Sequence, residues 1–238
     1  ALAKETAGDR IVVIGNASAI RTSDSIRYGL GARDRGLDGI MLTPPYYASP
    51  SDREILAHYQ SVSNAVPMPI LIYNIPSRQA VNIGMELLDK LCDVENVVAI
   101  KQSSGSFQDV TETLRVAKSR IRVLPGHSVD RGLPCLMMGA DGYVSSVEPQ
   151  ALGREAIQLY KLAVSGQVEE ARRVQFRCIE LDHAVHGGVG TFPASLKAAM
   201  NLMGRPGGYP REPLLALTAE QEAKLKATLA KLGTLTAV

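Results

Sequence analysis

Lys101 follows the apolar run of residues 97–100 and precedes the turn-forming sequence Gln-Ser-Ser-Gly. The apolar run predicts a buried strand, which would place the amine at the rim of the core. Apolar surroundings withhold water from an ammonium group and favour its neutral form. Because a neutral amine can attack a ketone and form a Schiff base, Lys101 is the first candidate for a catalytic residue.

Other groups able to bind or react lie within or just after the C-terminal parts of apolar runs. They are Tyr46, Tyr47, Tyr73, Gly126, His127, Val144 and Ser145. A phenol hydroxyl near the amine could carry protons to and from a carbinolamine. A solvated lysine at the rim and tyrosines packed in the core are the structural alternatives. One lysine together with two tyrosines at the same edge of a sheet favours catalysis.

Six short apolar runs are predicted to be the strands that position these residues. They are rich in Val, Ile and Leu and lack strict alternation, which is typical of strands covered on both faces. The runs are 11–15, 39–43, 70–74, 97–101, 121–126 and 142–146.

Helices are predicted between these strands, at 23–36, 51–64, 84–92, 107–119 and 128–138. Ser51 and Glu54 form a capping-box pattern at the start of the second helix. Strand starts recur roughly every 20 to 30 residues with no hairpin signal between them, so the strands are expected to be parallel.

After residue 150 the sequence predicts helices alone, at 152–165, 167–187, 192–203 and 218–231. We therefore expect residues 1–150 to form a partial β/α barrel. Residues 151–238 would supply the last barrel helix and a C-terminal helical region. Six βα units could form an open six-stranded sheet, or a TIM-type barrel that lacks its first two units. The abrupt first strand and the absence of an initial Met favour the second alternative.

Composition excludes several classes of function. The 238 residues are 45% hydrophobic with a net charge of +2, and no basic run suggests a nucleic-acid partner. No apolar stretch is long enough to span a membrane, and no secretory signal is visible. The cysteines Cys92, Cys135 and Cys178 are far apart, which predicts free thiols in the cytoplasm.

The remaining histidines suggest no metal centre. His183 and His186 could share a helix face near Glu180 and Asp182, but the spacing fixes no third ligand. We expect this pair to interact with the terminal carbonyls of its helix. His58 lies in a charged helical segment and is expected to be solvated.

Five motifs give the chain a resemblance to a known family. They are TPPYY (43–47), YNIPSR (73–78), AIKQSSG (99–105), LPGHS (124–128) and GADGYVSS (139–146). In order and spacing they resemble the dihydrodipicolinate synthase / N-acetylneuraminate lyase family of pyruvate-dependent class I aldolases. The similarity extends from about residue 10 to the C-terminal helices, and it implies a TIM (β/α)8-type barrel.

The resemblance also implies residue roles. Lys101 matches the Schiff-base lysine, and Tyr73 matches the tyrosine that shuttles protons. Tyr47 matches the tyrosine that enters the neighbouring subunit's site. Val144 falls where a backbone carbonyl faces bound pyruvate. Arg78 matches the arginine that grips the carboxylate of aspartate semialdehyde in the synthases.

Two further residues are expected to line the substrate pocket. Gly126 and His127 follow a strand end, although packing at the rim is an equal alternative for His127. Two departures from the synthase pattern stand out. The chain reads Gln79-Ala80 where synthases have Thr-Gly, and no Gly-Thr-Thr-Gly-Glu-like turn precedes residue 11.

The expected function is therefore a class I pyruvate-dependent aldolase or lyase, with 4-hydroxy-tetrahydrodipicolinate synthase as the first choice. The substrates would be pyruvate or another 2-keto acid and an aldehyde. A 2-keto-3-deoxy sugar-acid aldolase or dehydratase and a non-catalytic barrel fragment are the alternatives. No cofactor is expected because the lysine acts as the electron sink. The resemblance implies a homotetramer built from tight dimers.

Overall fold

The computed structural model describes residues 1–235, except for the side chain of Ser128. Two compact units make up this part of the chain. The first contains residues 1–126 and 138–144, and the second contains residues 127–137 together with the described residues from 145 onwards. No helix in the described part is both long enough and apolar enough to cross a bilayer.

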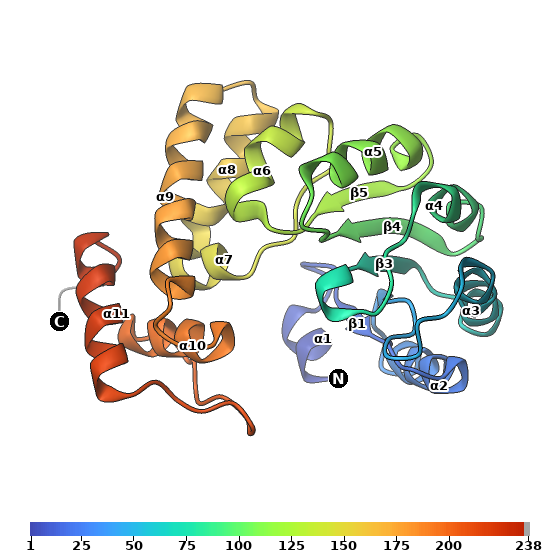
Figure 1. Cartoon of the computed structure of the whole chain (residues 1–238), viewed down its shortest axis with the longest axis horizontal. Helices are drawn as coiled ribbons and strands as arrows, with labels where there is room; N and C mark the ends of the chain where they lie inside the picture. The colour runs from blue at the N-terminus through green and yellow to red at the C-terminus, as the bar shows by residue number, and fades with distance from the viewer. Residues whose placement is uncertain (236–238) are drawn as a thin grey trace. The chain divides into compact units, whose positions relative to one another are not determined.

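A five-stranded parallel sheet organises the first unit, with its strands in chain order (Figure 1). The parallel pairing that the sequence predicts is confirmed along the whole ladder. The strands are β1 (Ile14–Asn16), β2 (Gly39–Leu42), β3 (Ile70–Asn74), β4 (Val97–Gln102) and β5 (Arg122–Pro125).

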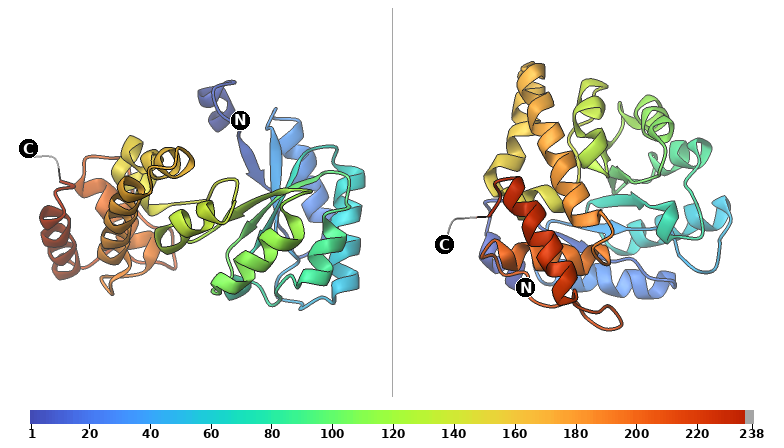
Figure 2. Two further views of the ribbon diagram at one scale, coloured as in Figure 1. Left: turned by 90° about the horizontal axis from the view of Figure 1, so that it is seen from above. Right: turned by 60° about the vertical axis from the view of Figure 1, so that its left-hand side comes forward.

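Crossover helices follow one another along the outer face of this sheet (Figures 1 and 2). They are α2 (Thr22–Arg33), α3 (Asp52–Ala65), α4 (Met85–Leu91) and α5 (Phe107–Ala117). The capping box is confirmed at the start of α3, where the Ser51 backbone N–H donates to Glu54 Oε2 over 2.8 Å. Ile40, Ile72 and Ile100 are fully buried in the core of this unit.

The first unit differs from the sequence prediction at both ends. A short helix, α1 (Leu2–Ala7), precedes the sheet, and the Lys4 ammonium pairs with Asp38 at 2.8 Å. Residues 142–146 do not form the predicted sixth strand, although Val144 N–H donates to the Pro125 carbonyl over 2.9 Å. The Asp141 carboxylate accepts from Val123 N–H and so takes a donor that a strand ladder would use.

In the second unit, the regular secondary structure of the described residues is helical. Its elements are α6 (Ser128–Met137), α7 (Val147–Leu152), the 3-10 turn η2 (Gly153–Glu155), α8 (Ala156–Val164), α9 (Val168–His186), α10 (Phe192–Leu202) and α11 (Ala219–Lys231). The predicted helix over 152–165 is wrong at its start, because Gly153 adopts a positive φ of 60° and separates α7 from α8. The helix predicted over 128–138 is confirmed despite Pro134. Buried side chains such as Leu181, Val185 and Leu225 form the core of this unit.

Candidate active site

Tyr73 and Lys101 form the centre of the candidate site. They are register partners in the ladder between β3 and β4, each one residue before the end of its strand. Lys101 Nζ lies 3.9 Å from the centroid of the Tyr73 ring, and both side chains are partly buried. The amine therefore rests on the face of the phenol ring.

The surroundings of this pair on the sheet are apolar. Side chains alternate between the two faces of a strand, so Leu71 and Ala99 share the face of Tyr73 and Lys101. Both are at least nine-tenths buried. On the other side Lys101 pairs in register with Leu124 of β5. The row Tyr73, Lys101, Leu124 thus places the amine between a phenol and an apolar side chain.

A polar network lies on the opposite face of the same strands. Asn74 Nδ2 donates to Gln102 Oε1 over 2.9 Å, and Gln102 Nε2 donates to Thr113 Oγ1 of α5 over 2.9 Å. All three side chains are at most 1% exposed. The network connects two strand ends to a helix behind the candidate site.

The turn after β3 carries Arg78. It is the short 3-10 helix η1 (Pro76–Arg78), and Arg78 is exposed. Gln79 holds this turn: its Nε2 donates to the Tyr73 carbonyl over 3.0 Å, and its Oε1 accepts from Ile75 N–H over 3.3 Å. Although Gln79 departs from the synthase pattern, its side chain fixes the turn that presents Arg78.

Gly126 and Val144 lie where β5 ends. Gly126 N–H donates to the Gln102 carbonyl over 2.8 Å. A Cβ at residue 126 would lie 2.0 Å from Ser103 Oγ, so only glycine fits without a shift of its neighbour. Val144 is held beside β5 by its bond to Pro125.

His127 belongs to the second unit and has a positive φ of 51°. Its exposed side chain lines a cavity of about 360 Å³ together with Asp182, His183 and His186. His186 Nδ1 lies 2.7 Å from Asp182 Oδ1, and the His186 ring stacks on Phe192 with centroids 4.4 Å apart. His186 therefore binds a carboxylate and a ring instead of the predicted helix carbonyls. Burial raises the pKa of Asp182, and the imidazole of His186 opposes that rise.

No metal centre accompanies these residues. Within residues 1–235, no group of three or more His, Cys, Asp or Glu side chains could hold a metal ion. Cys92, Cys135 and Cys178 are free thiols, as the sequence predicts. Burial raises the pKa of Cys135 to about 11 and that of Cys178 to about 12, which leaves both thiols protonated and unreactive at neutral pH.

Tyr47 lies in the loop between β2 and α3. Its side chain is 88% exposed and its backbone adopts a positive φ of 74°. For an aromatic residue this conformation is strained, and such strain is often associated with function.

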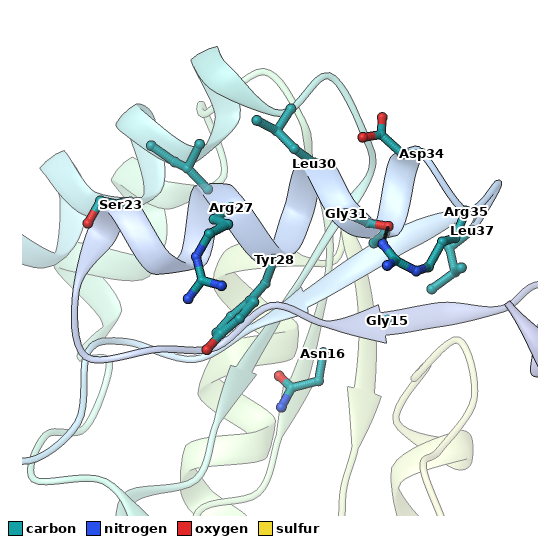
Figure 3. Close-up of a pocket in the computed structure, with 12 residues that line it drawn as sticks. Gly15, Asn16, Ser23, Arg27, Tyr28, Leu30, Gly31, Asp34, Arg35 and Leu37 are labelled. Carbon is teal, nitrogen blue, oxygen red and sulfur yellow. Dashed lines mark hydrogen bonds between the residues drawn. The ribbon is translucent and has the colours of Figure 1, made fainter.

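A further hollow of about 810 Å³ lies between β1 and α2 (Figure 3). Arg27 covers the Tyr28 ring there, with 4.6 Å between the guanidinium carbon and the ring centroid, and Asn16 projects from β1 nearby. None of the residues predicted for the active site lines this hollow.

Sequence reasoning missed the functional potential of Asn74, Gln79 and Gln102. Asn74 and Gln102 directly follow the two candidate residues, and a period of two places them on the other face. Asn74 and Gln102 could have been identified from the sequence, because each is a polar residue predicted to lie on the face of a strand that helices cover.

The fold and this pair of side chains define a class: a β/α-barrel enzyme with a strand-end lysine beside a phenol. Comparisons with known proteins agree with this class. The family model for the Dihydrodipicolinate synthetase family matches residues 1–232. The chain belongs to this family of lyase enzymes.

Individual relatives are similar over most of the chain. A 4-hydroxy-tetrahydrodipicolinate synthase of Halalkalibacterium halodurans is 35% identical over 222 residues, which is 93% of this chain and 74% of that protein. One from Archaeoglobus fulgidus is 31% identical, covering 94% and 76%. The crystal structure of a dihydrodipicolinate synthase from Thermotoga maritima matches with a TM-score of 0.89 at 28% identity, covering 98% and 79%. These similarities confirm the TIM-barrel fold class that the motifs imply.

Proposed function

We propose that this chain condenses pyruvate with an aldehyde through an imine on Lys101, in the manner of a 4-hydroxy-tetrahydrodipicolinate synthase. One observation carries the proposal: Lys101 Nζ lies 3.9 Å from the centroid of the Tyr73 ring, at the ends of two paired strands. The names of the similar curated proteins support the choice of reaction.

In the proposed reaction the neutral amine attacks the ketone carbon of pyruvate. The carbinolamine loses water to give an imine, and removal of a proton from the pyruvate methyl group gives an enamine. The enamine carbon bonds to the aldehyde carbon, whose oxygen takes up a proton, and water finally releases the product from the amine. The Tyr73 hydroxyl is the proposed carrier of these protons.

Arg78 is the proposed recognition residue for the second substrate. Its planar guanidinium suits a carboxylate bound through two parallel hydrogen bonds. We therefore propose an aldehyde that carries a carboxylate, with aspartate semialdehyde as the first choice. Gly126 and the Val144 backbone, both of the first unit, are proposed to line the pocket.

A homo-oligomer is part of the proposal. Tyr47 projects an exposed phenol from a strained backbone, as expected for a residue that enters a neighbouring subunit's site. Light scattering after size-exclusion chromatography would give the mass of the assembly. A cytoplasmic location is also proposed, on the basis of the three free thiols.

Reductive trapping tests the function directly. Sodium borohydride with labelled pyruvate should label the protein at Lys101, and peptide mapping should locate the label. Lys101→Arg should abolish labelling, whereas Lys90→Arg, an exposed control on α4, should not change it. A folded protein that takes up no label would contradict the proposal and favour a non-catalytic fragment.

A panel of aldehydes with pyruvate then identifies the partner. Consumption of aspartate semialdehyde supports the first choice. Use of sugar-acid aldehydes alone would instead identify a 2-keto-3-deoxy sugar-acid aldolase.

A further inference from the structure

We infer that Gln102 is the positioning residue that holds Lys101 over the Tyr73 ring. This inference rests on the proposed function of Lys101 and adds a residue to which no role has been given. Gln102 lies next to the amine along the chain, and its side chain points to the other face of the sheet.

Every polar atom of the Gln102 side chain has a partner. Oε1 accepts from Asn74 Nδ2 over 2.9 Å and from Ser104 N–H over 3.2 Å, and Nε2 donates to Thr113 Oγ1 over 2.9 Å. The side chain is 1% exposed, so these bonds form away from bulk water. Buried and satisfied amide networks of this kind make a local structure rigid.

Gln102 also connects the elements that surround the amine. Through Asn74 it joins β3, and through Thr113 it joins α5. Its backbone carbonyl accepts from Gly126 N–H over 2.8 Å, which connects β4 to the residue that follows β5. One residue therefore fixes the ends of three strands against a helix.

The register explains how this affects the amine. Asn74 pairs with Gln102 one position beyond the pair of Tyr73 with Lys101. The hydrogen bond between the Asn74 and Gln102 side chains therefore sets the separation of the two strand ends. This separation places the Lys101 amine over the Tyr73 ring on the opposite face of the sheet. Gln102 acts through Lys101 and does not touch substrate on that face.

Asn74 adds further anchors to the same arrangement. Its Nδ2 also donates to Asn82 Oδ1 over 2.8 Å, and its Oδ1 accepts from Ile83 N–H over 3.2 Å. Ser103 N–H donates to the Asn74 carbonyl over 2.8 Å. The partner that Gln102 binds is thus itself held in place, so loss of Gln102 should release mainly the Lys101 side of the pair.

The test compares variants by the rate at which borohydride traps pyruvate on folded protein. Gln102→Leu keeps the bulk and removes every side-chain hydrogen bond, and we expect at least a tenfold lower trapping rate at saturating pyruvate. Gln102→Glu keeps the length and the oxygen that accepts from Asn74 and Ser104 but loses the donor to Thr113, so it should recover the trapping rate only to the level of Thr113→Val. Gln108→Leu, an exposed glutamine of α5, is the matched control and should trap like the unmodified protein.

Thr113→Val provides a second variant in case Gln102→Leu fails to fold. It removes the acceptor of Gln102 Nε2, and it should lower the trapping rate about threefold to tenfold. Folded variants that trap pyruvate at the unmodified rate, even with a lower melting temperature, would show a structural role only and overturn the inference. Failure of the unmodified protein to take up label would instead refute the proposed function, which keeps the two failures distinct.

Discussion

Lys101 and Tyr73 face each other across the ladder between β4 and β3, with the amine 3.9 Å from the centroid of the phenol ring. The ring and the hydroxyl of Tyr73 can therefore be tested separately. The ring face supports the amine, whereas the hydroxyl at its far end can exchange protons.

Tyr73→Phe should retain the ring over the amine and remove only the proton carrier. We expect turnover to fall by about 10² to 10⁴, the usual contribution of a positioned acid or base. The final yield of imine trapped by borohydride after equilibration with saturating pyruvate should fall much less, because the amine keeps its place and a proton carrier changes rates, not the equilibrium. Equal losses in turnover and in this yield would contradict a proton-carrying role for the hydroxyl.

Arg78→Ala should weaken the use of an aldehyde that carries a carboxylate. Loss of a charged hydrogen-bonding partner costs about 1.5 to 3 kcal/mol, or roughly 10- to 100-fold in kcat/KM for that aldehyde. Imine formation with pyruvate should be unchanged, since Arg78 is carried by the turn after β3 and not by β4, the strand that carries Lys101. Arg53→Ala, at the start of α3, is a suitable exposed control.

His58 should make the stability of the protein fall in mild acid. Its side chain is 3% exposed and its Nδ1 lies 2.9 Å from Thr22 Oγ1, so the expectation of a solvated histidine is wrong. Burial lowers the pKa of His58 to about 4, while an unfolded chain has a histidine pKa near 6.5. Between these values only the unfolded state binds the proton, so the free energy of unfolding should decrease by about 3 kcal/mol as pH falls from 7 to 4.

Urea denaturation across this pH range would measure the effect. His58→Gln cannot take up the proton, so its stability should depend less steeply on pH than that of the unmodified protein. Parallel curves for the His58 variant and the unmodified protein would refute this account.

Gly126→Ala should destabilise the first unit by about 1 to 3 kcal/mol, because the added methyl group would lie 2.0 Å from Ser103 Oγ. A second change, Ser103→Gly, removes the obstructing atoms and should recover part of the loss. Gly84→Ala has no atom within 4 Å of the new Cβ and serves as the control. Thermal denaturation of the four proteins would settle the comparison.

Much of this architecture is predictable from the residues. Runs of Val, Ile and Leu predict β2, β3, β4 and β5 close to their observed bounds, but the run 11–15 overlaps β1 only at Ile14 and Gly15, since Ile11 and Val12 are exposed ahead of the strand. Turn and cap signals such as Ser51 with Glu54 predict the crossover helices. The sequence also predicts that Lys101 and Tyr73 lie close together, because parallel strands end at a common edge of the sheet.

Features that depend on tertiary packing are harder to predict from the sequence. His58 lies in a segment whose charges suggest exposure, yet its helix turns it inward. The role of Gln102 depends on partners 28 and 11 residues away, at Asn74 and Thr113, which no local pattern shows. The break at Gly153 depends on a positive φ that neighbouring helix-forming residues do not reveal.

The alternating direction of the side chains along β4 constrains how this protein can change. An insertion or deletion of one residue ahead of Lys101 would exchange the two sides of the strand. The Lys101 side chain would then face the helices, and the Gln102 amide would lie on the face of the sheet that carries the candidate active site. Single substitutions can therefore change this edge of the sheet one residue at a time. A one-residue insertion or deletion within β4 should instead abolish both imine formation at Lys101 and the hydrogen-bond network of Gln102.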